Sequence, residues 1–64
     1  MAQRTPREIR KAARKSLIAA AVGAGCSETT TRIYEADRSS VSDEKRAQLD
    51  AYYARLAATE ARST

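Results

Sequence analysis

The sequence predicts an all-α fold, a compact bundle of four to five helices, and three patterns carry this prediction. The segment Thr5-Pro6-Arg7-Glu8 has the residue types that begin a helix. Residues 17–24 are rich in alanine, the strongest helix former, and run into Gly25. Near the C-terminus, apolar residues recur at i, i+3, i+4 and i+7, namely Leu49, Tyr52, Tyr53 and Leu56. With 64 residues, the chain is expected to form one small domain over residues 5–60.

The first helix is expected over residues 6–14, after a basic N-terminal arm at residues 1–4. Thr5 is a good N-cap, and Pro6 fits the first helical position because its missing N–H is not needed there. Glu8 lies three residues after the cap and completes a capping box.

The second helix is expected over residues 17–23, although its start is weakly marked. No glycine or proline lies between Arg7 and Val22, so helix propensity alone favours one continuous helix from residue 6 to about 24. Ser16 can cap a new helix. A bend at this point would allow four segments to pack together, and a continuous helix would bury less core.

A turn and a third helix follow, the helix over residues 27–36. Gly25 can adopt the left-handed conformation that ends a helix, and Ser27 can cap the next one. Cys26 between them is interpreted as a small apolar residue of the core. The preceding helix carries small residues that allow close approach: Ala20, Ala21 and Ala24. Two short helices joined by a glycine-bearing turn form a helix-turn-helix unit.

Residues 37–42 are expected to form a loop with Val41 as its apolar anchor. The last helix is expected over residues 43–60, with Asp43 and Glu44 at its positive end. A frayed tail is expected at residues 61–64.

Charge is concentrated at the N-terminus. Six basic residues stand against Glu8 alone in residues 1–15, a net charge of +5, whereas the whole chain carries +4. Such a segment is typical of proteins that bind a polyanion, either a nucleic acid or an anionic membrane surface. The alternative is a solvated basic helix face without a ligand.

Several function classes are excluded by composition. There is no histidine and only one cysteine, so a structural zinc site and an intrachain disulfide are not expected. Without histidine the usual general base is missing, and we expect neither an enzyme nor a cofactor. The apolar run at residues 17–24 is too short to cross a bilayer. An intracellular, cytoplasmic protein is therefore expected, with no membrane partner and no small-molecule ligand.

Residues 9–42 resemble the helix-turn-helix domain of the lambda-repressor-like (Cro/XRE) family of small phage and bacterial regulators. With Leu17 as the first position of the twenty-residue unit, the matching residues are Ala20, Ala21, Ala24, Gly25, Cys26, Thr31, Tyr34 and Glu35. The pair Ile9-Arg10 matches the Leu-Arg of the family's first helix. Three positions depart from the family. Leu17 replaces a phosphate-binding glutamine, Thr31 replaces valine or isoleucine, and Asp37 replaces a glycine.

The resemblance implies that the third helix enters the major groove of double-stranded DNA. The implied base contacts are Ser27, Glu28, Thr29, Thr30, Arg32 and Ile33. The candidate phosphate contacts are Arg4, Arg7, Lys15, Ser16, Arg38, Ser39 and Ser40. A homodimer, at least on DNA, is also implied, and Tyr53 and Leu56 are its candidate contacts. Core packing is an equally good interpretation of these two side chains.

The predicted function is that of a sequence-specific transcription regulator, a repressor of phage or mobile-element type. One alternative is a small helical protein-interaction module, antitoxin-like or a phage adaptor. Another is an architectural, excisionase-like DNA binder.

Overall fold

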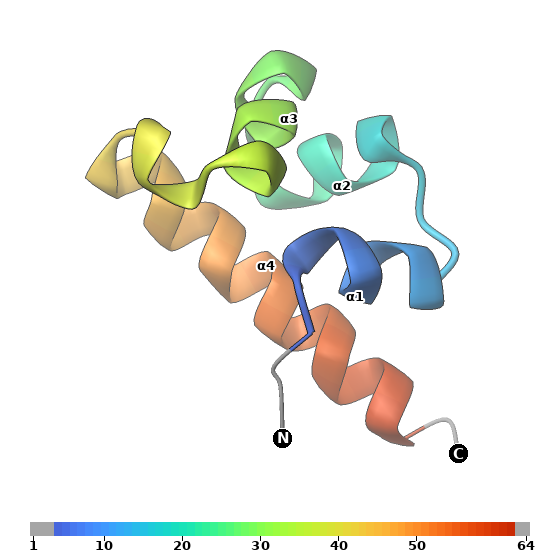
Figure 1. The fold of residues 1–64 in the computed structure, drawn as a ribbon. Coiled ribbons are helices and arrows are strands. Elements are labelled where there is room, and N and C mark those ends of the chain that lie inside the picture. The colour runs from blue at the N-terminus through green and yellow to red at the C-terminus, as the bar shows by residue number, and fades with distance from the viewer. Residues whose placement is uncertain (1–3, 63–64) are drawn as a thin grey trace.

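Four α-helices and one short 3₁₀ turn make up residues 4–62, the part of the chain that this computed structural model describes (Figure 1). Side chains are described for residues 4–59. The elements are α1 (Pro6–Ala12), α2 (Leu17–Ala24), α3 (Glu28–Ala36), the turn η1 (Arg38–Ser40) and α4 (Asp43–Arg62). The predicted all-α fold is confirmed, with four helices. Most of the predicted basic arm, at residues 1–3, and the end of the predicted tail, at residues 63–64, lie outside the described residues, whereas residues 61–62 of that tail belong to α4.

The start of α1 is the predicted capping box. The Thr5 hydroxyl accepts a hydrogen bond from the Glu8 backbone N–H at 3.2 Å, and the Glu8 carboxylate accepts one from the Thr5 backbone N–H at 2.8 Å. Two otherwise unpaired backbone donors at a helix start are satisfied in this way. The helix ends at Ala12, two residues before the predicted end.

A sharp corner separates α1 from α2, so the continuous-helix alternative is wrong. Arg14 has a φ of 59°, in the left-handed region. The Lys15 N–H bonds to the Arg10 carbonyl at 3.1 Å, and the Arg14 N–H bonds to the Lys11 carbonyl at 3.0 Å. This is the Schellman pattern of a helix end, with arginine at the position where glycine is usual. The Ser16 hydroxyl then accepts from the Ala19 N–H at 3.0 Å and caps α2, as predicted.

The α2–α3 turn repeats this geometry with the usual residue. Gly25 has a φ of 76°, and the Cys26 N–H reaches the Ala21 carbonyl at 2.9 Å. Ser27 caps α3 through its hydroxyl, which accepts from the Thr30 N–H at 3.0 Å. The turn therefore forms as the sequence predicts, and it brings α2 and α3 together as a helix-turn-helix unit.

The core lies where α1, α2 and α3 pack on one side of α4, which runs the length of the molecule (Figure 1). Leu49 is completely buried, and the rings of Tyr34 and Tyr53 stack with their centroids 5.4 Å apart. Val41 is buried, as expected for the loop anchor, and Cys26 is partly buried against the core. Within residues 4–62, no helix combines the length and apolar character needed to cross a bilayer.

Close approach of α2 to α4 depends on Gly23. A Cβ atom at this position would overlap the ring of Tyr52, which is itself buried. Ala20, Ala21 and Ala24 are buried on the same helix, so small side chains allow α2 to lie directly against its neighbours.

Gly23→Ala is expected to destabilise the fold by about 1–2 kcal/mol, because overpacking at the Tyr52 ring outweighs the better helix propensity of alanine. Urea denaturation measures this loss. In a Tyr52→Leu background the same substitution is expected to cost less, since the overlapping ring is gone. An equal cost in both backgrounds would show that the ring is not the cause.

Arg14→Gly is expected to increase the free energy of unfolding by about 0.5–1 kcal/mol, because glycine adopts a positive φ without a steric penalty. Lys11→Gly removes the same charge inside α1 and is the matched control. It is expected to lower stability by about 0.5–1 kcal/mol. Equal effects of the two substitutions in thermal denaturation would contradict the proposed strain at Arg14.

Candidate nucleic-acid interface

One face of α3 is exposed and the other is held in the core. Thr31 is completely buried, and its hydroxyl donates to the Ser27 carbonyl at 2.9 Å. Tyr34 is 3% exposed. The exposed side of the helix consists of Glu28, Thr29, Arg32, Ile33 and Ala36. Four of the six candidate base contacts, Glu28, Thr29, Arg32 and Ile33, therefore point away from the core.

The other two base-contact candidates are engaged within the protein. The Ser27 hydroxyl donates to the Thr30 hydroxyl at 2.8 Å while it caps the helix. Thr30 is partly buried. These two side chains fix the start of α3, and less of their hydrogen-bonding capacity remains for a ligand.

Glu28 and Arg32 pair along the helix surface. Arg32 Nη2 donates to Glu28 Oε2 at 3.0 Å, and the side chain of Arg32 is 63% exposed and that of Glu28 is 45% exposed. An exposed i,i+4 pair of this kind contributes only about 0.2–0.5 kcal/mol. Since a guanidinium has five N–H donors, Arg32 keeps most of its donors for another partner.

An ion pair between Arg10 and Glu35 joins α1 to α3. Arg10 Nε donates to Glu35 Oε2 at 2.6 Å and Nη2 donates to Oε1 at 3.0 Å, and the two side chains are only 13% and 8% exposed. The Tyr53 hydroxyl donates to Glu35 Oε2 from α4. A third donor of Arg10, Nη1, reaches the Lys15 carbonyl at 3.1 Å in the α1–α2 corner.

This network controls the charge of Glu35. Burial alone would raise the pKa of the carboxyl, but hydrogen bonds from Arg10 and Tyr53 outweigh burial and hold its pKa below the ordinary value of 4.5. The sequence contained no periodic signal for this contact. Its only trace was the match of Ile9-Arg10 and Tyr34-Glu35 to the family pattern.

The candidate phosphate contacts near α1 are exposed. Arg4, Arg7 and Lys15 all lie at the surface. Among the described side chains, neither Arg7 nor Lys15 forms an ion pair or a side-chain hydrogen bond. Ser16 is also exposed, but its hydroxyl is used as the cap of α2.

The candidates after α3 are held by carboxylates of the protein. Arg38 binds Asp50 through Nε and Nη2, at 2.9 and 2.5 Å. Asp50 also accepts from the Tyr34 hydroxyl at 2.6 Å, and burial together with this hydrogen bond raises the pKa of Tyr34 to about 12. The hydroxyls of Ser39 and Ser40 each donate to Asp37 at 2.7 Å. This end of α3 therefore carries less uncompensated positive charge than α1.

The structure does not support Tyr53 and Leu56 as dimer contacts. Both are part of the core, 3% and 9% exposed, so little of their surface is available to a second copy. Core packing is the interpretation that their contacts support. The exposed large apolar side chains are Ile18 and Val22 on α2, 59% and 76% exposed, and Ile33 on α3.

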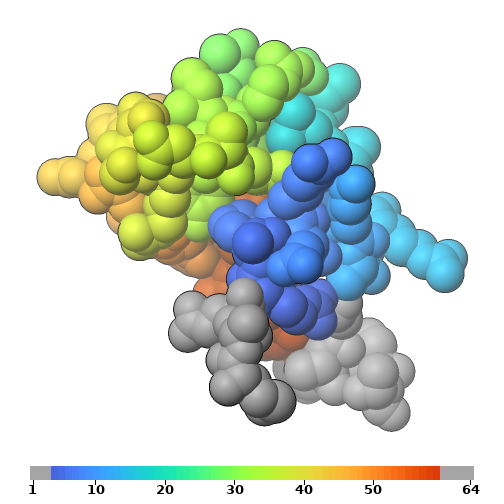
Figure 2. Space-filling view, viewed as in Figure 1, coloured from blue at the N-terminus to red at the C-terminus, as the bar shows by residue number. Residues whose placement is uncertain are grey.

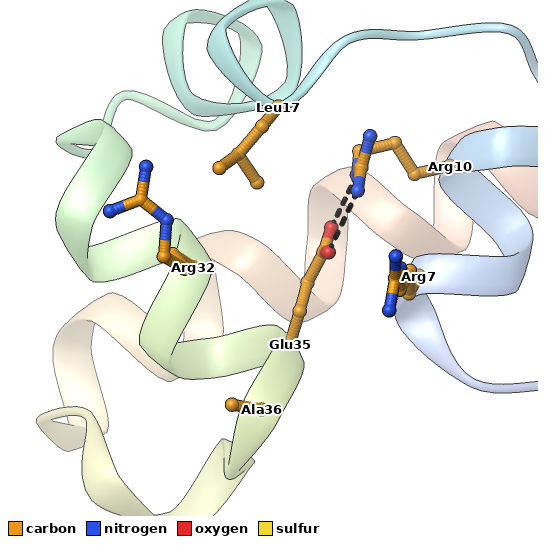
Figure 3. A pocket seen from close by; sticks show the side chains of 6 residues that line it. All are labelled: Arg7, Arg10, Leu17, Arg32, Glu35 and Ala36. Carbon is orange, nitrogen blue, oxygen red and sulfur yellow. Dashed lines mark hydrogen bonds and ion pairs between the residues drawn. The ribbon is translucent and has the colours of Figure 1, made fainter.

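A pocket of about 290 Å³ lies between the basic helix α1 and α3 (Figure 3). In Figure 2, the blue surface of α1 adjoins the green surface of α3 on one face of the molecule. The residues that line the pocket are Arg7, Arg10, Leu17, Arg32, Glu35 and Ala36. The fold thus places Arg7, a phosphate candidate, and Arg32, a base candidate, on opposite sides of one pocket. Sequence reasoning did not place these two residues at one site.

Among the described residues, no three potential metal ligands lie close enough together to hold an ion.

The chain matches no known protein family, no curated protein and no solved structure. The lambda-repressor-like resemblance stays a prediction.

Glu35→Gln is expected to lower the free energy of unfolding by about 3 kcal/mol at pH 7, because it leaves the Arg10 guanidinium shielded from water without its counter-charge. Asp43→Asn is the control, since Asp43 is 97% exposed and its pair with Arg46 is expected to contribute less than about 1 kcal/mol. Urea denaturation compares the two variants.

The pH dependence gives a second measurement of the same pair. The folded-state pKa of Glu35 is lowered, so its contribution is complete above the ordinary value of 4.5 and is lost as the pH falls through the folded pKa. The stability difference between the parent and the Glu35→Gln variant is therefore expected to shrink below about pH 4.5. A constant difference between pH 7 and pH 3 would contradict the assigned pairing.

Proposed function

We propose that this protein binds double-stranded DNA in a sequence-specific manner and regulates transcription, with α3 as the reading helix. One observation carries the proposal. α3 is fastened to the core by Thr31 and Tyr34, so that Thr29 and Ile33 face outward, and Glu35 joins the same helix to the basic helix α1 through Arg10.

The outward side chains suit contact with base edges. A threonine hydroxyl can donate to or accept from a base, and its methyl group can touch a thymine methyl. Ile33 is 41% exposed and offers apolar surface to the same kind of methyl group. Glu28 could accept from a cytosine amino group, and its pair with Arg32 lessens repulsion from phosphates.

The charge distribution supports a polyanionic partner. Residues 1–15 carry a net charge of +5, and α1 lies next to α3. Lysine and arginine side chains that meet phosphates release condensed counterions, which supplies affinity independent of sequence. A domain with one short reading helix contacts few base pairs, so we expect two copies on adjacent half-sites about 34 Å apart.

The apolar face of α2 favours a second candidate function, that of a protein-interaction module. Ile18 and Val22 lie one turn apart on α2 and are largely exposed, and no residue of Leu17–Ala24 is charged or polar. Loss of a protein partner by an Ile18→Ser and Val22→Ser double variant that still binds DNA would support this function.

A gel shift with duplexes selected from a random pool, repeated between 50 and 200 mM salt, tests DNA binding. Thr29→Glu, which puts a carboxylate on the outward face of α3, is expected to weaken binding about 10-fold or more through repulsion from phosphates. Ala54→Glu adds the same charge at an exposed position of α4 and is expected to change affinity by less than about 2-fold. Equal weakening by both variants, or no selected duplex preferred over random DNA, would overturn the proposal.

A further inference from the structure

Three of the six residues that line the pocket between α1, α2 and α3 are arginines. Arg7 and Arg10 extend from α1 on one side, and Arg32 stands on the opposite side on α3 with its guanidinium turned away from them (Figure 3). Leu17 and Ala36 supply its remaining apolar lining. The volume of about 290 Å³ is roughly ten times the ~30 Å³ that a water molecule occupies in the liquid, so a polyatomic group and its waters can enter.

The one acidic lining residue is already neutralised. Glu35 accepts from two nitrogens of Arg10 and from the Tyr53 hydroxyl. Arg10 in turn uses its third nitrogen on the Lys15 carbonyl. Arg10 and Glu35 therefore compensate each other's charge, and the charge available to a ligand comes from Arg7 and Arg32.

Arg7 and Arg32 are free to bind such a ligand to different degrees. Among the described side chains, Arg7 has no hydrogen-bond or ion-pair partner, although its charge also acts on the Glu35 carboxylate. Arg32 spends one nitrogen on Glu28 at a 63% exposed position, a weak contact that leaves four N–H donors unused. If Arg32 turns toward Arg7, the two guanidiniums on opposite sides of the pocket suit an oxyanion, because planar N–H pairs bind phosphate oxygens in bidentate fashion.

We propose that Arg7 and Arg32 form a clamp that holds one phosphate group of the DNA backbone in this pocket. The inference rests on the proposed function and changes one assignment within it, since Arg32 then fixes the position of α3 on the duplex and does not read a base. The clamp occupies the side of α2 where Leu17 offers no polar side chain. In this arrangement, the side chains that distinguish base sequences are Thr29, Ile33 and Glu28 on the outward face of α3.

The test measures DNA affinity and its salt dependence for Arg7→Ala, Arg32→Ala and the double variant, on a selected duplex and on a scrambled one. Each single variant is expected to weaken both duplexes about 3- to 10-fold at 50 mM salt, by the same factor for each duplex. Arg55→Ala on α4 removes an equal charge away from the pocket and is the matched control. Circular dichroism and thermal midpoints check that all variants fold.

The salt slope separates one shared phosphate from two independent contacts. Each phosphate that the protein neutralises adds about 0.9 to the magnitude of the slope of log K against log salt. If the two arginines share one phosphate, the magnitude of this slope is expected to be about 0.9 lower for the double variant than for the parent protein. If they bind two separate phosphates, it is expected to be about 1.8 lower. A loss near 1.8 would overturn the clamp.

Other outcomes are equally decisive. If the parent protein binds DNA and the pocket variants behave like Arg55→Ala, the clamp is overturned and the proposed function stands. A changed base preference in Arg32→Ala would identify Arg32 as a base reader and overturn the clamp. If the parent binds no DNA, both proposals fail. Titration with inorganic phosphate, monitored by the NMR signals of the arginine Nε–H groups, distinguishes a pocket for small anions from one for a DNA phosphate. Saturation at low millimolar phosphate without DNA binding would overturn the DNA assignment.

Discussion

The ion pair between Arg10 and Glu35 fixes where α3 lies relative to α1. Glu35 is the last polar residue of α3, and its carboxylate is held by α1 through Arg10 and by α4 through Tyr53. Arg10 also bonds to the Lys15 carbonyl, so the corner before α2 belongs to the same network. Because one carboxylate connects three helices, the position of the exposed α3 face depends on the contacts that Glu35 makes with α1 and α4.

This arrangement divides the charges of the molecule into two groups. Arg10, Arg38 and Arg46 are bound to acidic side chains and serve the fold. Arg7 and Lys15 have no such partners among the described side chains and remain for a polyanion. The net charge of +4 does not distinguish these groups, whereas the structure does. Desolvation gives the reason, since the shielded Arg10 requires a counter-charge and exposed groups do not.

The helices could be predicted because their signals are local. Thr5, Ser16 and Ser27 each cap a helix as expected, and Gly25 ends α2 with a positive φ. The end of α1 could not be predicted, since Arg14 adopts the left-handed conformation at a position where glycine would have been the signal.

The exposed face of α3 could be predicted from the register of the helix, but the long-range contacts could not. The bonds from Arg38 to Asp50 and from Arg10 to Glu35 depend on how helices pack, and nothing in local spacing predicts their partners. Tyr53 and Leu56 show the same limit, because an amphipathic stripe does not reveal whether its own chain or a second copy covers it.

The packing of α2 also sets how the sequence can diverge. Positions 20, 21, 23 and 24 admit only small side chains, and position 25 requires a residue that tolerates positive φ. Positions 18 and 22 are open to solvent and impose no such size limit. Distant relatives are therefore expected to keep small residues at these five positions, together with an arginine and a glutamate 25 positions apart. The rest of their sequence is expected to vary.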